Sequence, residues 1–221
     1  MLYNVVVNDW GETTYVPTTL GNILLGIVIL ALVAVAMVFV KKHTRKLTVK
    51  QIAFCAVTVA LGTVLSNITL FYFPTGGSVT LLSMLVICLP GYWFGLGAGL
   101  LTGMAFGILD LLINPYVLYP MQLVLDYVLA FAALGLSGLF SGAKNGLLKG
   151  YITGVVGRYV VAVISGWIFF GVYAWEGWSP FFYSLAYNAI YIFTEAAATI
   201  IILLLPPIKK VMAIGKKLAT E

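Results

Sequence analysis

The chain has 221 residues, of which 62% are hydrophobic and 9% are charged, and its mean hydropathy is +1.08. Soluble globular domains are nearer half apolar and a quarter charged, so this composition excludes a soluble domain and predicts a polytopic membrane protein. The net charge of +5 is explained by the topology described next, and it gives no reason to expect a nucleic-acid partner.

Seven hydrophobic stretches approach the roughly twenty residues that a helix needs to cross the hydrocarbon core of a bilayer. They lie near residues 20 to 40, 50 to 72, 79 to 94, 95 to 113, 118 to 140, 150 to 173 and 183 to 205. The sequence therefore predicts an all-α polytopic membrane protein.

The basic residues follow the odd-numbered spans. They are Lys41, Lys42, Arg45, Lys46 and Lys50 after the first span, Lys144 and Lys149 after the fifth, and Lys209, Lys210, Lys216 and Lys217 after the seventh. Cytoplasmic loops collect Lys and Arg. We therefore expect the N-terminus outside and the C-terminus in the cytoplasm, with Asp9, Glu12 and Glu176 on the outer side.

The first span is expected to be an addition to a six-helix core. Residues 1 to 19 are polar and lack a basic start, and the span ends at Lys41 and Lys42 without a small-residue cleavage pattern, which argues for a retained anchor over a signal peptide. The expected division is an extension with an extra transmembrane helix and a basic linker (1–49), a substrate-binding core (50–208), and a basic cytoplasmic tail (209–221).

Catalytic and metal-binding patterns are missing from the sequence. Cys55 and Cys88 lie within apolar spans and do not resemble a secreted disulfide framework. His43 is the only histidine and lies in the basic stretch KKHTRK, so no zinc site is expected. There is no Ser, His and Asp set, phosphate-binding Gly-rich loop or HExxH motif. We expect neither enzymatic activity nor a cofactor or metal in this chain.

In the second span, Ala53, Ala56 and Ala60 share one helical face. Small residues allow another helix to approach closely in a membrane. This face packs within the chain or docks a partner, and the spacing does not decide between them. The connection FYFPTGGSVT that follows is not helical throughout and forms a lid or a plain turn.

The fourth span carries Gly95, Gly99, Gly103 and Gly107 at a four-residue spacing. This spacing gives a helix a flat groove, so the stripe predicts close packing within the bundle.

Polar residues then enter the membrane after a helix break at Asn114, Pro115 and Pro120. Asp126 and its neighbours Gln122 and Tyr127 lie one to two turns deep. An aspartate near mid-helix costs about 2.5 to 3.5 kcal/mol on insertion scales. Asp126 therefore forms a structural ion pair with Arg158 or contacts a ligand.

Arg158 is the one basic residue within a span. It snorkels to the surface, pairs with Asp126, or pairs with Glu195 of the seventh span. The aromatics that follow it, together with Tyr183 and Asn188, suggest a pocket for a small, flat and cationic ligand, because aromatic faces attract organic cations.

Three blocks in order carry a family resemblance: GAGLLTGMAFGILDLL, PMQLVLDYVLAF and RYVVAVISGWIFFGVYAWEGWSPFFYSLAYNAIY. They resemble the thiamine-specific substrate-binding S component of energy-coupling factor transporters, from about residue 50 to residue 205. The resemblance implies a six-helix component of the bacterial cell membrane that binds thiamine from outside. It also implies docking, through the alanine face, on a transmembrane coupling protein with two ATPase subunits, which use ATP where this chain does not.

The same resemblance implies the substrate-binding residues. They are Tyr116, Asp126, Tyr127, Arg158, Gly166, Phe170, Tyr183 and Asn188. The chain departs from the family where Ala162 replaces a frequent histidine, where Phe106 and Phe170 replace tryptophans, and where Val57 replaces a docking alanine. Thr80 and Leu81 lie where the family has a glutamate.

Other functions stay open from sequence. One alternative is that the same architecture binds another flat heterocycle, such as a thiamine precursor. A second is that the chain is an ATP-independent carrier. A membrane scaffold without a ligand would leave Asp126, Arg158 and Asn188 paired only with one another.

Overall fold

The computed structural model describes residues 3–7, 13–21, 23, 24, 27, 31, 34, 46–73, 77–116 and 118–221. Most of the span expected near 20 to 40, and residues 41 to 45 with His43 among them, lie outside these described residues. The described elements are β1 (Tyr3–Val7), β2 (Thr13–Pro17), α2 (Val49–Asn67), β3 (Thr69–Tyr72), β4 (Ser78–Thr80), α3 (Ser83–Phe94), α4 (Leu96–Ile113), α5 (Pro120–Leu123), the π-helix η1 (Val124–Leu129), α6 (Ala130–Leu134), the 3₁₀ helix η2 (Gly135–Phe140), α7 (Gly146–Phe169), the 3₁₀ helix η3 (Gly171–Tyr173), α8 (Pro180–Leu204) and α9 (Pro206–Thr220).

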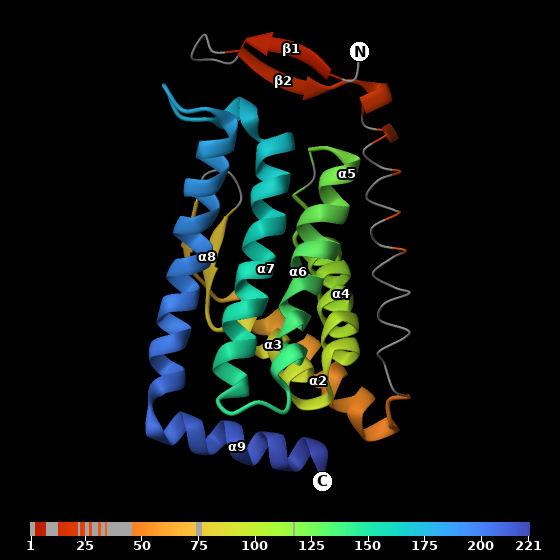
Figure 1. Cartoon of the computed structure of the whole chain (residues 1–221), viewed down its shortest axis with the longest axis vertical. Coiled ribbons are helices and arrows are strands. Elements are labelled where there is room, and N and C mark those ends of the chain that lie inside the picture. Colours follow the sequence, from red (N-terminus) through yellow and green to blue (C-terminus); the bar gives the residue numbers. More distant parts are fainter. Residues whose placement is uncertain are drawn as a thin grey trace.

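The six expected core spans are present as helices (Figure 1). Five are long and apolar enough to cross a membrane, among them the continuous segment Pro120–Phe140 that joins α5, η1, α6 and η2, and α3 is a shorter apolar helix. The prediction of an all-α multi-pass membrane protein is confirmed, with two small β-hairpins added to it.

Four span boundaries differ from the expected positions. Residues 69–72 of the second span form β3, and α3 begins at Ser83 where a start near 79 was expected. The helix α7 runs from Gly146 to Phe169 where 150 to 173 was expected. The β3 strand pairs antiparallel with β4, matching Thr69 to Thr80 and Tyr72 to Ser78. A run of Thr, Phe and Tyr favours a strand, and the Pro and Gly residues that follow it stop a helix.

Helix starts follow local capping chemistry. The Thr48 side chain accepts a hydrogen bond from Gln51 N (3.3 Å), and Gln51 Oε1 accepts one from Thr48 N (3.0 Å), which makes a capping box at α2. At α8, the Ser179 hydroxyl accepts a hydrogen bond from Phe182 N, and Pro180 occupies the first turn.

Gly99, Gly103 and Gly107 of α4 pack against the backbone of the Pro120–Phe140 span, as their spacing predicted, whereas Gly95 precedes α4 and a Cβ there would meet nothing within 4 Å. A Cβ atom at Gly99 would lie 2.7 Å from the Gly135 carbonyl oxygen, and one at Gly107 would lie 2.7 Å from the Tyr127 carbonyl carbon. Around this contact lies the buried core, which includes Met84, Ile87, Cys88, Phe106, Leu134, Tyr151 and Ile192. The stripe thereby fixes the segment that carries Asp126 and Tyr127.

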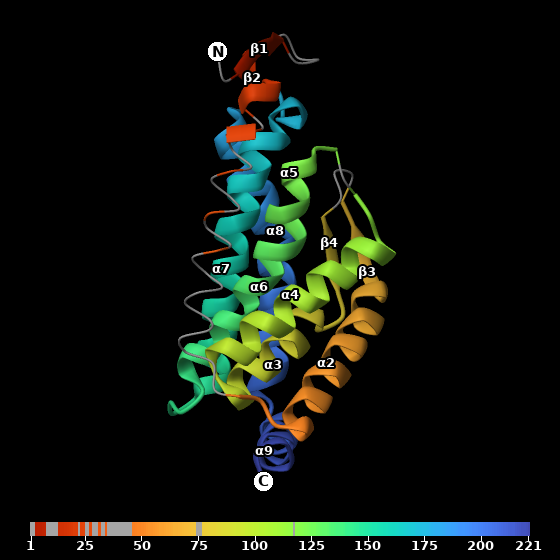
Figure 2. The same ribbon diagram turned by 90° about the vertical axis from the view of Figure 1, so that its right-hand side faces the viewer.

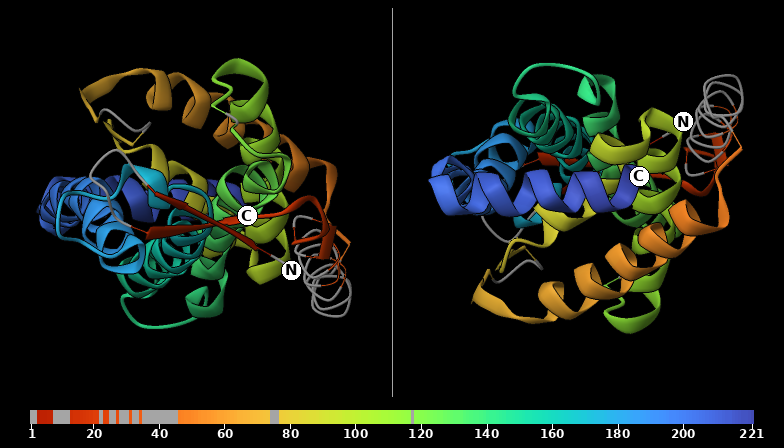
Figure 3. Two further views of the ribbon diagram at one scale, coloured as in Figure 1. Left: turned by 90° about the horizontal axis from the view of Figure 1, so that it is seen from above. Right: turned by 90° about the horizontal axis from the view of Figure 1, so that it is seen from below.

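The two ends of the bundle differ. The β1–β2 hairpin, which pairs Tyr3 with Pro17 and Val7 with Thr13, lies at one end, and α9 runs across the other end (Figures 1 and 2). The domain boundary expected at 208 falls inside α9. Seen along the bundle, α2 lies on one flank (Figure 3), where it contacts α3 and α4.

Replacing Gly107 with alanine is predicted to lower the free energy of unfolding by about 1 to 3 kcal/mol, because overpacking of a tight contact forces the backbones apart. Gly142→Ala is the matched control, since a Cβ there meets nothing within 4 Å. Thermal unfolding in detergent measures both. Equal melting temperatures for the two variants would contradict this account of the packing.

Candidate ligand-binding cavity

A cavity of about 420 Å³ lies among β3–β4, the end of α4, the α5–α6 segment, α7 and α8. A volume in this range suits a small-molecule ligand. All eight residues predicted for substrate binding line it: Tyr116, Asp126, Tyr127, Arg158, Gly166, Phe170, Tyr183 and Asn188. The structure thus brings together side chains that lie up to 72 positions apart in the sequence (188 minus 116).

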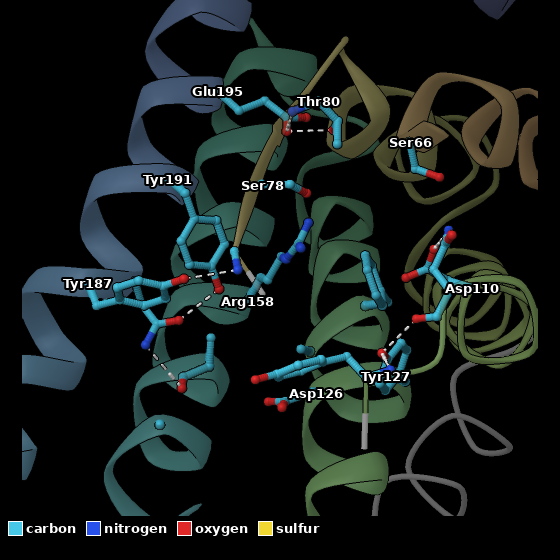
Figure 4. Close-up of a pocket in the computed structure, with 18 of the residues that line it drawn as sticks. Ser66, Ser78, Thr80, Asp110, Asp126, Tyr127, Arg158, Tyr187, Tyr191 and Glu195 are labelled. Atoms are coloured by element: carbon cyan, nitrogen blue, oxygen red, sulfur yellow. Dashed lines mark hydrogen bonds between the residues drawn. The ribbon is translucent and has the colours of Figure 1, made fainter. Parts of the chain in front are cut away.

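Arg158 adopts none of the ion pairs considered from sequence. Among the described residues, neither Asp126 nor Glu195 approaches it within the 4.0 Å of a salt bridge. Its guanidinium lies 4.4 Å from the centre of the Phe131 ring. Figure 4 shows Arg158 extending into the cavity, with Tyr187 and Tyr191 on one side and Asp110 across from them. The charge is held by an aromatic face and stays open to the cavity.

Asp126 lies on the π-helical turn η1. Such turns insert an extra residue, re-aim side chains, and occur often at functional sites. Within the described part of the chain, its carboxylate makes no ion pair within 4.0 Å, and its hydrogen-bonding neighbours are the neutral side chains of Ser165 and Gln122. A carboxylate in this setting is costly without a partner. The cavity therefore contains a carboxylate and a guanidinium that do not form an ion pair with each other.

Two buried side chains bond to the backbone of Asn114, Tyr116 and Leu118. The Tyr127 hydroxyl accepts a hydrogen bond from Tyr116 N (2.7 Å) and donates one to the Asn114 carbonyl (2.9 Å). The Gln122 amide donates to the Tyr116 carbonyl (2.9 Å) and accepts from Leu118 N (2.8 Å). Both side chains thus position Tyr116 through its backbone.

Aromatic rings form one wall. Tyr116 and Phe170 are nearly parallel, with an interplanar angle of 13° and centroids 6.2 Å apart. Tyr183 meets Trp175 edge to face at 5.2 Å. Burial raises the pKa of the Tyr116 phenol, which lies between two spans, above its ordinary value, so this ring stays neutral at physiological pH.

The Asn188 side chain forms hydrogen bonds within the protein. Its amide donates to the Ser184 carbonyl (2.9 Å) and the Ala162 carbonyl (3.4 Å), and its Oδ1 accepts from Tyr191 Oη (2.7 Å). At Gly166 a Cβ would lie 3.0 Å from Asn188 Nδ2. The close approach at this glycine is therefore made by α8, and Asn188 braces α7 against α8 while it lines the cavity.

Glu195 anchors the wall made by the β3–β4 hairpin. Its carboxylate is 4% exposed and accepts four hydrogen bonds: from Thr80 N (3.0 Å), Thr80 Oγ1 (2.7 Å), Ser83 Oγ (3.3 Å) and Met84 N (3.2 Å). It therefore satisfies donors at the start of α3. A second anchor is the Tyr187 hydroxyl, which accepts from Gly77 N at 3.0 Å.

Sequence reasoning missed part of the site. Tyr187 and Tyr191 line the cavity, and their signal was the four-residue spacing from Tyr183, which puts all three on one face of α8. The role of Glu195 left no such signal, because Thr80 is 115 positions away. Of the departures from the family pattern, Ala162 and Thr80 line the cavity, whereas Phe106 is buried against Phe131 at 4.7 Å.

The arrangement suits binding. An unpaired carboxylate, parallel aromatic rings and a guanidinium can hold a flat molecule that carries a positive charge. The described residues include no group of three His, Cys, Asp or Glu side chains placed to hold a metal ion.

Comparison with known proteins identifies relatives of this chain. A family model described as thiamine transporter protein matches residues 52–214. The thiamine transporter ThiT of Bacillus subtilis (strain 168) is 36% identical over 132 residues, covering 53% of this chain and 68% of that protein. A solved structure of ThiT from Listeria monocytogenes superposes with a TM-score of 0.66 at 27% identity, covering 76% of this chain and 96% of that one. Every residue predicted for the cavity lies inside the matched region.

Replacing Glu195 with glutamine is predicted to destabilise the junction between β4 and α3. The amide has one acceptor oxygen, and its NH₂ group would face backbone donors, at a cost of about 1 to 3 kcal/mol for donors left unsatisfied. Hydrogen exchange at the amides of Thr80 and Met84 should accelerate. Glu176→Gln, at an exposed turn, is the control, and unchanged exchange in Glu195→Gln would show that the carboxylate is not the anchor.

Proposed function

The chain belongs to the thiamine transporter protein family, and we propose that it is the substrate-capture subunit of an ATP-driven importer that binds thiamine outside the cell. The observation that carries the proposal is the cavity, in which Asp126 and Arg158 are free of internal ion pairs beside the Tyr116 and Phe170 rings. The Bacillus and Listeria relatives are named for the same vitamin.

The chemistry of thiamine matches the lining. Its thiazolium ring is flat and permanently positive, its aminopyrimidine ring is flat and donates hydrogen bonds, and its side arm ends in a hydroxyl. Asp126 supplies the complementary negative charge, and the faces of Phe170 and Tyr116 supply cation–π and stacking contacts. Arg158 is placed to donate hydrogen bonds to the neutral, polar end of the molecule.

The expected release step requires partners. We propose that α2 docks on a membrane coupling protein that is joined to two ATPase subunits, and that ATP hydrolysis by those subunits drives release inside. Support comes from the α2 surface, where Ala53, Ala56 and Ala60 are exposed and Val57 is 63% exposed. A helix face that the bundle leaves open and that is built of small residues suits close approach by a second protein.

The lysine distribution supports the direction of uptake. The start of α2 and the turn between η2 and α7 lie at the end of the bundle that α9 crosses, and the turn between η3 and α8 lies at the opposite end (Figures 1 and 2). The first two segments carry Lys46, Lys50, Lys144 and Lys149, and the last carries Glu176. Under the positive-inside rule the α9 end is cytoplasmic. The β3–β4 hairpin and the Asn114–Tyr119 segment would then face the outside, where the substrate arrives.

The alternatives differ in what they require of the site. A membrane scaffold without a ligand needs Asp126 and Arg158 to pair with one another, and they do not. Another flat heterocycle would use the same aromatic wall, and an ATP-independent carrier would use the same cavity without a docking face. Titration with thiamine and with other heterocycles separates the possible ligands, and uptake with and without the ATPase module separates the two modes of transport.

Asp126→Asn is predicted to weaken thiamine binding at least about tenfold, or roughly 1.4 kcal/mol, because it removes the charge that complements the thiazolium. Isothermal titration of the purified protein with thiamine, and with each of its two rings alone, measures this. Asp110→Asn is the control: it removes a charge from the same cavity, but at another wall, near the end of α4, and its effect should be smaller. If the unaltered protein gave no heat with thiamine and bound another heterocycle, the substrate assignment would be wrong.

Ala56→Trp is predicted to abolish ATP-driven uptake while thiamine binding in detergent is retained, since the indole would hold the docking partner away from α2. Ala197→Trp, on an exposed position of α8, should leave uptake intact. Proteoliposomes that contain the chain with or without the ATPase module provide the assay. Uptake that persists without the module would favour the ATP-independent carrier.

A further inference from the structure

The helix α9 has a position and a pattern that ligand capture does not explain. It follows α8 directly after Leu205 and runs across the lysine-bearing end of the bundle (Figures 1 and 3). If the spanning helices cross a bilayer, α9 lies in the plane of its surface. Its three sides meet three different surroundings.

One side of α9 packs on the bundle. Ile208 and Met212 contact the core, and Ala219 is 2% exposed. Lys216 fastens the helix, because its ammonium donates to the Ser141 carbonyl at 2.7 Å and lies 4.1 Å from the centre of the Tyr92 ring. These contacts fix the rotation of α9 about its own axis.

A second side is apolar and open. Val211, Ile214 and Leu218 follow one another at spacings of three and four residues, so they form one stripe. Their exposed fractions are 56%, 58% and 61%. The apolar half of α9 is therefore divided between a flank against the bundle and a flank that no described residue covers.

The third side is basic. Lys209, Lys210 and Lys217 are exposed there, and Lys217 makes only an exposed pair with Glu221 at 3.8 Å, which contributes little. Lys46, Lys50, Lys144 and Lys149 lie at the same end. A partner that binds these lysines would carry negative charge. The open apolar flank next to them would be buried in hydrocarbon.

We propose that α9 is an interfacial helix that binds anionic phospholipids, with Val211, Ile214 and Leu218 among the acyl chains and Lys209, Lys210 and Lys217 on the phosphate groups. An in-plane helix with an apolar side and a lysine-rich side has the pattern of helices that lie at the membrane surface. Basic residues near the surface of an anionic leaflet gain about 1 kcal/mol each. The inference is independent of the identity of the transported ligand.

The test uses the full chain in two nanodiscs, one of phosphatidylcholine alone and one in which about a third is phosphatidylglycerol. Hydrogen exchange of residues 206–220 is measured in each. We expect phosphatidylglycerol to slow exchange in α9 about tenfold or more, and added salt to reduce the difference. The triple variant Lys209→Gln, Lys210→Gln and Lys217→Gln should lose this difference.

A matched triple variant, Lys46→Gln, Lys144→Gln and Lys149→Gln, removes the same charge outside α9 and should keep most of the difference. Ile214→Asp should raise exchange in both nanodiscs, because it places a charge among the acyl chains. Equal exchange in the two nanodiscs for the unaltered chain would overturn the proposal, and so would protection of α9 that appears only when the ATPase module is added.

Discussion

Polar groups inside a bilayer have to find their partners within the protein, because the hydrocarbon offers none. At the walls of the cavity this requirement is met by side chains that bond to backbone. Gln122 and Tyr127 bond to the backbone before the fifth span, Asn188 joins α8 to α7, and Glu195 holds the start of α3. Each of these bonds shapes a wall of the cavity, so satisfying the membrane's constraint also builds the site.

Two charged side chains of the cavity differ from these groups. Asp126 and Arg158 line the same cavity, and neither makes an ion pair with another described residue. Burying such groups is costly unless something binds them, and a ligand of complementary charge offsets that cost. The proposed capture of a cationic vitamin follows from these charges without ion pairs more than from the shape of the cavity.

The sequence predicted the spanning helices, most of the glycine packing and eight of the residues that line the cavity, because apolar length, small-residue spacing and family motifs are local signals. It could not predict the Glu195 anchor, whose partners are more than a hundred positions away, or that Arg158 rests on Phe131. The strand β3 was taken for helix because apolar residues alone do not distinguish the two. The exposed surface of α9 was not predicted either, because the rotation of this helix about its axis depends on tertiary contacts such as the Lys216 bond to Ser141.

The most direct measurement is an experimental structure of the chain with thiamine. The account predicts that the vitamin lies in the cavity, with one ring stacked on Phe170 or Tyr116 and its positive charge or amino group facing the Asp126 carboxylate. Thiamine bound elsewhere, or bound in the cavity with Asp126 and Arg158 turned away from it, would contradict the claim that these unpaired charges are the reason for the site.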